Sequence, residues 1–457
     1  MMIKNSLEIK GSLDLLPPEP IAVIGMAGFF PGASNLLQYW DNLLEGRDCI
    51  VEVPPERWSL DGFFTPHQFR GATGATSYCK WGGFLDAEQT KELLAAEFNC
   101  DVKDRQSKLI LRTIGAALQS LEKSSSSSSE DYRKTTGVYV GAIPFVEDAN
   151  IGAFEIVGNG QLAGAISRAH GLSGPSIVLD LHSASAISAL HLACAGLRAG
   201  DCETAIAAAG MMLNKDHFVF GSQAGILAND PTYRSYAQER SGIILGEGAG
   251  AVVLRPLSKA VANQDPILAV IRTTNHGFIG NHNVNSSDDL LISLDFEKVT
   301  SLVEGAIMRA RVDPQSISYL DCAAPGLPIG DVLELEATLK AFSNLTSAKN
   351  FCAVGSVKPN IGHLAAASGI SQLIKVILQI KNKKISPMIK ALPIDREINL
   401  EDSAFYLKHE LAEWKRPVRL VGGVEYEHPR RALVNSFGYG GFFACAIVEE
   451  YLEESRG

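Results

Sequence analysis

The chain has 457 residues, a length usual for two or three domains, and its 46% hydrophobic and 20% charged residues are typical of an ordered globular protein. Its net charge of -10 argues against a general nucleic-acid binder, which needs a basic surface to meet phosphates. No apolar run is long enough for a membrane span or a signal peptide, so we expect a cytoplasmic location without membrane contact.

The eight cysteines are irregularly spaced, and no two of them form a CxxC pair. In a chain of this length, such spacing predicts reduced and mostly buried thiols. It favours neither a disulfide framework nor a metal site.

The first elements precede any regular repeat. Residues 1–18 are expected to form a loose leader, and a buried strand is predicted at 21–27. Residues 28–90 are rich in glycine, proline and aromatics, which predicts a long, structured loop region. An amphipathic helix is predicted at 104–122, and the serine run at 124–129 is interpreted as a solvated loop.

From residue 135 the pattern repeats strand, glycine and helix. Strands are predicted at 136–142, 176–182, 204–212, 248–257, 267–275, 317–323, 351–357, 431–437 and 443–450. Helices are predicted at 184–199, 296–311, 332–343 and 364–381. The strands lack clean alternation, as expected when both faces are buried. The sequence therefore predicts an α/β fold with an N-terminal half at 19–260 and a C-terminal half at 261–457.

Ser183 lies where a buried strand meets the start of a helix. A small polar residue at that junction meets free backbone N–H groups and the positive end of the helix dipole. Such a place suits a nucleophile or the binding of an oxyanion. The alternative interpretation is that Ser183 only caps the helix.

Two further segments combine strands, tight turns and polar residues. Lys358 and His363 flank a turn that leads from a strand into a helix. A single histidine is more often structural than catalytic, so both interpretations of His363 stay open. Glu334 follows a loop rich in proline and glycine, where a carboxylate suits a helix N-terminus without any further function.

Together these segments resemble the β-ketoacyl synthase family, in particular the ketosynthase domains of modular polyketide synthases. The similarity extends from about residue 19 to residue 450. Its matches are EPIAVIGMAGFFPGA at 19–33, PPERW at 54–58, YCKWGGFL at 78–85, GEGAG at 246–250, VGSVKPNIGHL at 354–364 and NSFGYGG at 435–441. The resemblance implies the thiolase fold, with two related α/β halves in α-β-α-β-α layers, and a homodimer. It also implies a thioester substrate on the phosphopantetheine of an acyl carrier protein, with no other cofactor.

The same resemblance shows where condensation chemistry is lost. The family's nucleophilic cysteine aligns with Ser183 in DLHSASAI, and the first catalytic histidine aligns with Ala323 in AAPGL. The second histidine is kept as His363. A serine hydroxyl does not ionise at neutral pH as a cysteine thiol does, so acyl loading should fail.

Other family positions divide into those that are kept and those that are altered. Lys358 and Glu334, a supporting pair in the family, are retained. By resemblance, the backbone N–H groups of Ser183 and Phe437 form an oxyanion hole. Phe442 and Phe443 replace a Thr-Asn pair. The expected pocket positions are Ala323, Asn435, Phe442 and Phe443, the two phenylalanines adding apolar walls.

The retained groups suit half of the family's reaction, the loss of carbon dioxide from a malonyl thioester. Several aligned donors can hold the resulting enolate, each contributing about 2.7–4 kcal/mol. The chain most resembles the stand-alone, serine-bearing ketosynthases of polyketide β-branching, which supply acetyl-carrier protein to a 3-hydroxy-3-methylglutaryl-synthase-like enzyme. Two alternatives remain, a non-catalytic partner like the chain-length factors, and a serine acyltransferase or hydrolase acting on carrier-bound chains.

Overall fold

A computed structural model describes residues 18–66, 74–95, 98, 102, 104–122, 132–145, 159–280, 294–421 and 423–453. The predicted leader up to residue 17 and the predicted serine loop at 124–129 lie outside the described residues. Within these ranges, no helix has the length and hydropathy needed to cross a membrane.

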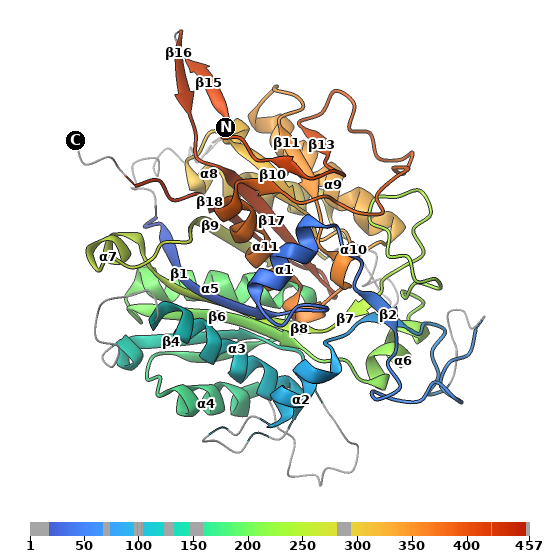
Figure 1. Ribbon diagram of the computed structural model, residues 1–457. Coiled ribbons are helices and arrows are strands. Elements are labelled where there is room, and N and C mark those ends of the chain that lie inside the picture. The colour runs from blue at the N-terminus through green and yellow to red at the C-terminus, as the bar shows by residue number, and fades with distance from the viewer. Residues whose placement is uncertain are drawn as a thin grey trace, which may run out of the picture.

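Eleven strands form one sheet in the order β13-β11-β10-β17-β18-β9-β1-β8-β6-β4-β5 (Figure 1). Their bounds are β1 Ile21–Phe29, β4 Thr136–Gly141, β5 Ser176–Leu179, β6 Thr204–Met211, β8 Gly248–Pro256, β9 Ala269–Phe278, β10 Ile317–Asp321, β11 Cys352–Gly355, β13 Phe405–Leu407, β17 Arg431–Gly438 and β18 Phe442–Glu449. The two parts of the sheet meet through β1 and β9, which pair antiparallel over three residues. Each predicted strand therefore has a counterpart, although several ends differ by one to three residues.

Helices lie outside the two parts of the sheet and between them. Their bounds are α1 Leu36–Leu44, α2 Ala87–Ala95, α3 Arg105–Glu122, α4 Asn159–His170, α5 Ser185–Ala199, α6 Lys215–Gln223, α7 Leu257–Ala262, α8 Phe296–Ala310, α9 Pro328–Leu345, α10 Lys358–Ile361 and α11 Ser368–Asn382. The central helix α5 contacts β4 and β6 on one side and β9 on the other, and α11 likewise contacts both β8 and β17. With α3 below and α8 and α9 above, the predicted α-β-α-β-α layering is confirmed (Figure 1).

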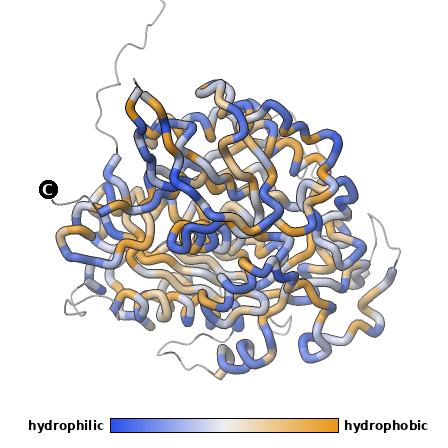
Figure 2. The backbone as a smooth tube through the Cα atoms, turned by 45° about the horizontal axis from the view of Figure 1, so that its top comes forward, coloured by the Kyte–Doolittle hydropathy of each residue, from blue (hydrophilic) through white to orange (hydrophobic). Residues whose placement is uncertain are grey.

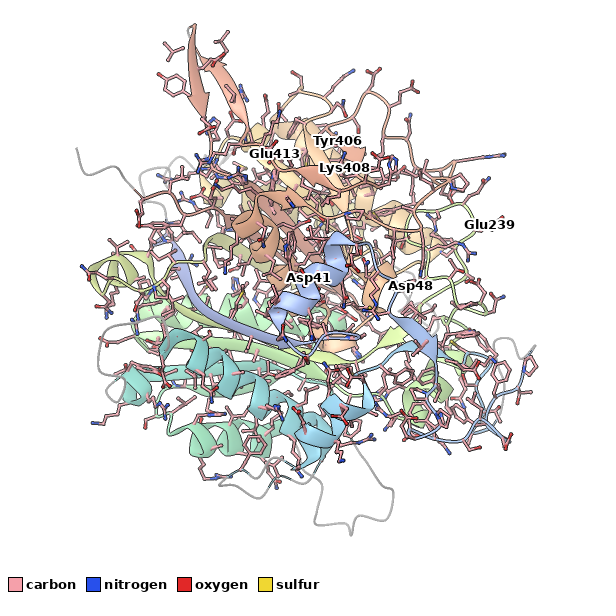
Figure 3. The ribbon with its side chains drawn as sticks, in the orientation of Figure 1. Asp41, Asp48, Glu239, Tyr406, Lys408 and Glu413 are labelled. Atoms are coloured by element: carbon pink, nitrogen blue, oxygen red, sulfur yellow. The ribbon has the colours of Figure 1, made fainter. Side chains whose placement is uncertain are left out.

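Elements in or next to the middle layer are buried on all sides, and their sequences are correspondingly apolar. Helix α11 is buried at every position from Ser368 to Ile380, as expected for a helix covered on all sides. Strand β1 is buried over its whole length except at Phe29. Hydrophobic residues accordingly gather in the central strands (Figure 2), while the acidic side chains of Asp41 and Glu239 lie at the surface (Figure 3).

The predicted loop region at 28–90 contains a helix that the sequence analysis missed. Helix α1 begins after Asn35, whose side-chain oxygen accepts hydrogen bonds from the N–H groups of Leu37 and Gln38. Tyr39 and Trp40 then fix its buried face. The cap and this face form a helix of only nine residues, which the surrounding glycines and aromatics obscured.

Smaller elements were also missed. The remaining short strands are β2 Ile50–Glu52, β3 Trp81–Gly83, β7 Leu245–Gly246, β12 Lys384–Ile385, β14 Ala412–Glu413, β15 Val418–Val421 and β16 Val424–Glu427. Strands β15 and β16 form a hairpin that projects from the body of the protein (Figure 1). None of these elements alters the layered core.

Candidate active site

Ser183 occupies a short turn between β5 and α5. The turn spans His182–Ala184, and Ser185 ties it down, because its hydroxyl accepts from the N–H of Leu181 at 2.8 Å and donates to the carbonyl of His182 at 2.6 Å. The N-cap of α5 is Ala184 and no side chain caps it, so the interpretation of Ser183 as a capping residue is wrong. Among the described residues, the N–H of Ser183 has no acceptor, which leaves it available to a ligand.

His363 approaches Ser183 from a segment far away in the sequence. Its backbone N–H donates to the carbonyl of Ile244 at 2.8 Å, and its own carbonyl accepts from Gly246 at 2.9 Å. These bonds hold the imidazole so that Nε2 lies 3.4 Å from the Ser183 hydroxyl. The structure therefore brings together the two residues that the sequence placed 180 positions apart.

The second ring nitrogen determines what His363 is able to do. Nδ1 accepts a hydrogen bond from the N–H of Ala365 at 3.1 Å, so the neutral ring carries its proton on Nε2. Burial, and after it the positive charge of Lys358, lowers the pKa of His363 to about 3. Near neutral pH this imidazole is a fixed hydrogen-bond donor, without a free nitrogen to act as a base toward Ser183.

Phe437 is positioned by direct contact between β17 and the serine turn. The hydroxyl of Ser436 donates to the carbonyl of Ser183 at 2.6 Å. At Gly438 no side chain fits, because an added Cβ would collide with the carbonyl of Leu181. Ser183, Phe437 and His363 consequently line one cavity, which is the set expected for an oxyanion hole.

The loop that has lost the family's first histidine is held by a buried carboxylate. Glu334 accepts from the N–H groups of Ala323 at 2.8 Å and Ala324 at 2.7 Å. Burial raises the pKa of Glu334 to about 7 and lowers the pKa of Lys358 to about 8. Glu334 thus holds the backbone of this loop, and within the described part of the chain no direct ion pair joins it to Lys358.

The cavity in front of these groups has a volume of about 450 Å³. Most of its wall is apolar, and it includes Met211, Ile226, Leu245, Leu294, Leu327 and Phe437. Pro325 and Leu327 of the altered loop also face it. This space is large enough for a short acyl thioester.

The expected pocket positions require a correction, because none of Ala323, Asn435, Phe442 and Phe443 lines this cavity. Phe443 lies behind Phe437, with ring centroids 4.8 Å apart, and the amide of Asn435 donates to Thr338 at 3.1 Å. Alternation along β18 turns Phe443 into the core. Phe443 therefore acts on the cavity only by supporting Phe437, whereas Phe442 packs against Phe278 with ring centroids 6.3 Å apart.

The cavity residues that the sequence did not indicate include two histidines and a tyrosine, His182, His217 and Tyr439. His182 stands next to Ser183 in the chain, so its proximity was readable from the sequence. His217 and Tyr439 come from α6 and from the glycine-rich turn, and only the fold places them at this cavity.

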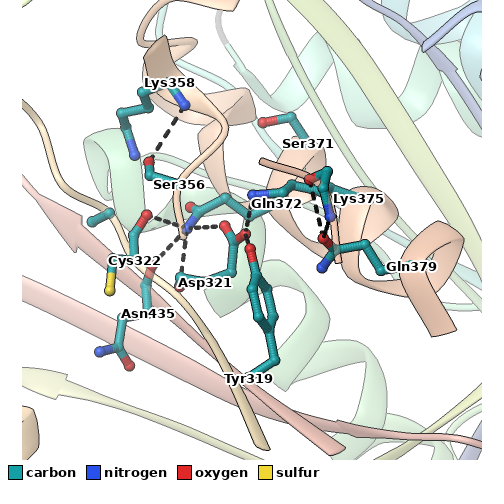
Figure 4. A network of polar contacts seen from close by, with 12 residues as sticks. Tyr319, Asp321, Cys322, Ser356, Lys358, Ser371, Gln372, Lys375, Gln379 and Asn435 are labelled. Carbon is teal, nitrogen blue, oxygen red and sulfur yellow. Dashed lines mark hydrogen bonds and ion pairs between the residues drawn. The ribbon is translucent and has the colours of Figure 1, made fainter. Parts of the chain in front are cut away.

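A buried polar network supports the floor of the site (Figure 4). Lys375 forms an ion pair of 2.7 Å with Asp321, and both side chains are almost fully buried. The amide of Gln372 donates to the carbonyls of Cys322 and Asn435, at 3.0 and 3.1 Å. These contacts join α11 to β10 and β17 directly beneath the altered loop.

The family models described as "Beta-ketoacyl synthase, N-terminal domain" and "Beta-ketoacyl synthase, C-terminal domain" match residues 18–260 and 276–391. The polyketide synthases PksL and PksR of Bacillus subtilis are each 34% identical over 95% of this chain, which spans only 10% and 17% of their lengths.

Solved structures show the same architecture. An oxazolomycin ketosynthase domain from Streptomyces albus superposes with a TM-score of 0.83 and 30% identity, over 96% of this chain and 75% of that one. The ketosynthase from module 6 of the Bacillus subtilis bacillaene synthase gives a TM-score of 0.80 and 28% identity, over 95% and 72%. The layered fold of this chain is therefore shared with these solved ketosynthase domains.

Proposed function

Because the chain belongs to the β-ketoacyl synthase family, we propose that it decarboxylates malonyl-acyl carrier protein to acetyl-acyl carrier protein without condensation. Its product would serve polyketide β-branching, as the resemblance to serine-bearing ketosynthases suggests. The substrate arrives as a thioester on the phosphopantetheine of the carrier, and no other cofactor is required.

The hydrogen-bonding state of His363 is the observation that carries the proposal. Decarboxylation places negative charge on the thioester oxygen, and an Nε2–H donor beside the N–H of Ser183 is suited to hold it. Acyl transfer to the Ser183 hydroxyl would instead need a base, and both nitrogens of His363 are already committed. This argues against the serine hydrolase alternative.

The apolar cavity adds a second contribution. A malonyl carboxylate among apolar side chains such as Met211, Leu294 and Leu327 loses part of its hydration. Loss of carbon dioxide removes that buried charge, so the surroundings favour the products. An open cavity of this kind also argues against a purely structural partner subunit.

The proposal extends to quaternary structure. Strand β5 is the outermost strand of its half of the sheet, and 40% of Ile177 is exposed there. An unpaired edge with apolar side chains is a ready template for a second strand. We infer a homodimer in which the β5 strands of two copies pair.

One assay tests the proposed reaction. Purified protein is incubated with malonyl-carrier protein, and the intact carrier mass and released carbon dioxide are followed together. We expect acetyl-carrier protein and carbon dioxide in equal amounts, without free malonate. An unchanged carrier would refute decarboxylation, and acyl transfer onto the protein or release of malonate would support the serine acyltransferase or hydrolase.

A further inference from the structure

The proposed reaction requires a proton that the oxyanion donors do not supply. Once carbon dioxide has left, the carbon of the enolate must receive a proton to become the acetyl methyl group. His363 is unsuited, because its pKa of about 3 keeps the ring neutral and its Nε2–H is needed at the oxygen. The question is which other group in the cavity carries an exchangeable proton.

His217 is held in the same way as His363. Its Nδ1 accepts from the N–H of Asn214 at 3.2 Å, and burial lowers its pKa to about 4. Glu334 also lines the cavity, and burial raises its pKa to about 7, but both of its oxygens already accept backbone N–H groups, so neither oxygen is free to carry a proton toward a substrate. Neither group is arranged to deliver a proton and recover it.

His182 differs from both. Its backbone is fixed, since its N–H donates to Asp180 at 2.9 Å and its carbonyl accepts from Ser185. Its imidazole packs edge-on against Tyr439, with centroids 5.1 Å apart, and makes no hydrogen bond within the described part of the chain. The ring is only partly buried, so it is able to exchange protons with water.

The backbone of His182 also adopts an uncommon conformation. Its φ is +48°, in the left-handed region that residues other than glycine and asparagine rarely enter. Such a conformation persists where surrounding contacts enforce it, and it recurs at functional sites. Here it places an imidazole on the wall of the cavity immediately beside Ser183.

We propose that His182 is the proton donor to the enolate carbon, an inference that rests on the proposed decarboxylation. The bond between the carboxylate and the methylene carbon breaks, and its electron pair forms the enolate while carbon dioxide leaves. The imidazolium of His182 then gives its N–H proton to that carbon. The neutral imidazole recovers a proton from solvent, so that each turnover consumes one proton.

Two variants are compatible with the backbone at this position. His182→Gly removes the ring, tolerates positive φ and leaves room for a small molecule. His182→Asn also tolerates positive φ but fills the space with a side chain that does not titrate. Both are expected to lower the decarboxylation rate about 100-fold, within the usual range for general acids. Thermal unfolding of each variant controls for the fold.

Chemical rescue separates proton delivery from a structural role. Imidazole in the buffer should restore part of the rate of His182→Gly and none of that of His182→Asn.

The outcomes distinguish this inference from the function on which it rests. A wild type that releases no carbon dioxide would overturn both. A wild type that decarboxylates, with His182→Asn equally fast or with His182→Gly unresponsive to imidazole, would overturn only the role of His182.

Discussion

At His363, the location of one proton determines which chemistry the residue supports. Its Nδ1 is committed to the N–H of Ala365, and burial keeps the ring neutral. An imidazole in this state stabilises negative charge and does not activate a hydroxyl. Ser183 accordingly contributes its backbone N–H to the proposed oxyanion hole, whatever its side chain adds.

Replacing His363 with alanine should lower decarboxylation about 100-fold or more, because one of the main enolate donors is lost. His363→Gln, which keeps an N–H donor, should lose less. Because the pKa of His363 is about 3, its protonation should cause no loss of activity between pH 5 and 8. Steady-state rates across that range check both statements. A wild-type rate in His363→Ala would show that the backbone N–H groups alone stabilise the enolate.

Restoring the family's nucleophile should not restore condensation. In Ser183→Cys a thiol returns, but Ala323 still lacks the imidazole of the first histidine, and Pro325 and Leu327 keep that side of the cavity apolar. We expect the variant to acylate slowly and to form no elongated product from acyl and malonyl donors. Mass analysis of the carrier would detect elongation, and efficient elongation would contradict this view of the site.

At the scale of elements, β10, α9 and α11 hold the altered loop by buried polar contacts. The ion pair of Lys375 with Asp321 lies where α11 meets β10 (Figure 4). Glu334 fixes the loop from the side of α9. The loop therefore keeps a defined backbone although its catalytic side chain is gone.

Lys375→Met should lower the free energy of unfolding by about 3–5 kcal/mol, because it leaves the carboxylate of Asp321 buried without its partner. Lys259→Met is the matched control. Its ion pair with Glu203 is 2.9 Å long, but both side chains are at least half exposed, so we expect a loss of less than about 1 kcal/mol. Urea denaturation measures the free energy of unfolding of both variants. Equal losses would contradict the larger contribution that we expect from the buried ion pair.

For the whole molecule, the exposed edge at β5 bears on assembly. If the β5 strands of two copies pair, the protein should elute with twice the mass of one chain. Ile177→Lys places a charge on that edge and should shift the equilibrium toward monomer. Light scattering after size exclusion measures the molar mass in solution. A variant that keeps the mass of a dimer would show that β5 does not form the interface.

The fold was largely predictable because local patterns dictate its main elements. Apolar runs without alternation predicted the buried strands. An amphipathic stretch predicted α3, and a mostly apolar stretch predicted α11. Helix α1 was not predicted, because its segment has the composition of a loop. A capping asparagine and two buried aromatic residues form the helix there. The division into two halves at residue 260 stays a prediction.

The sequence by itself determined the family, the replacement of the condensing cysteine by Ser183, the loss of the first histidine and the retention of His363. Only the tertiary structure decided that His363 is a donor, that Phe443 faces the core and that His217 and Tyr439 line the cavity. The physical reason is that the proton position on an imidazole and the direction of a side chain depend on neighbours whose positions the folded backbone sets. The N–H of Ala365 reaches His363 only through the shape of the turn, and the ring of Phe437 meets Phe443 only because β17 pairs with β18.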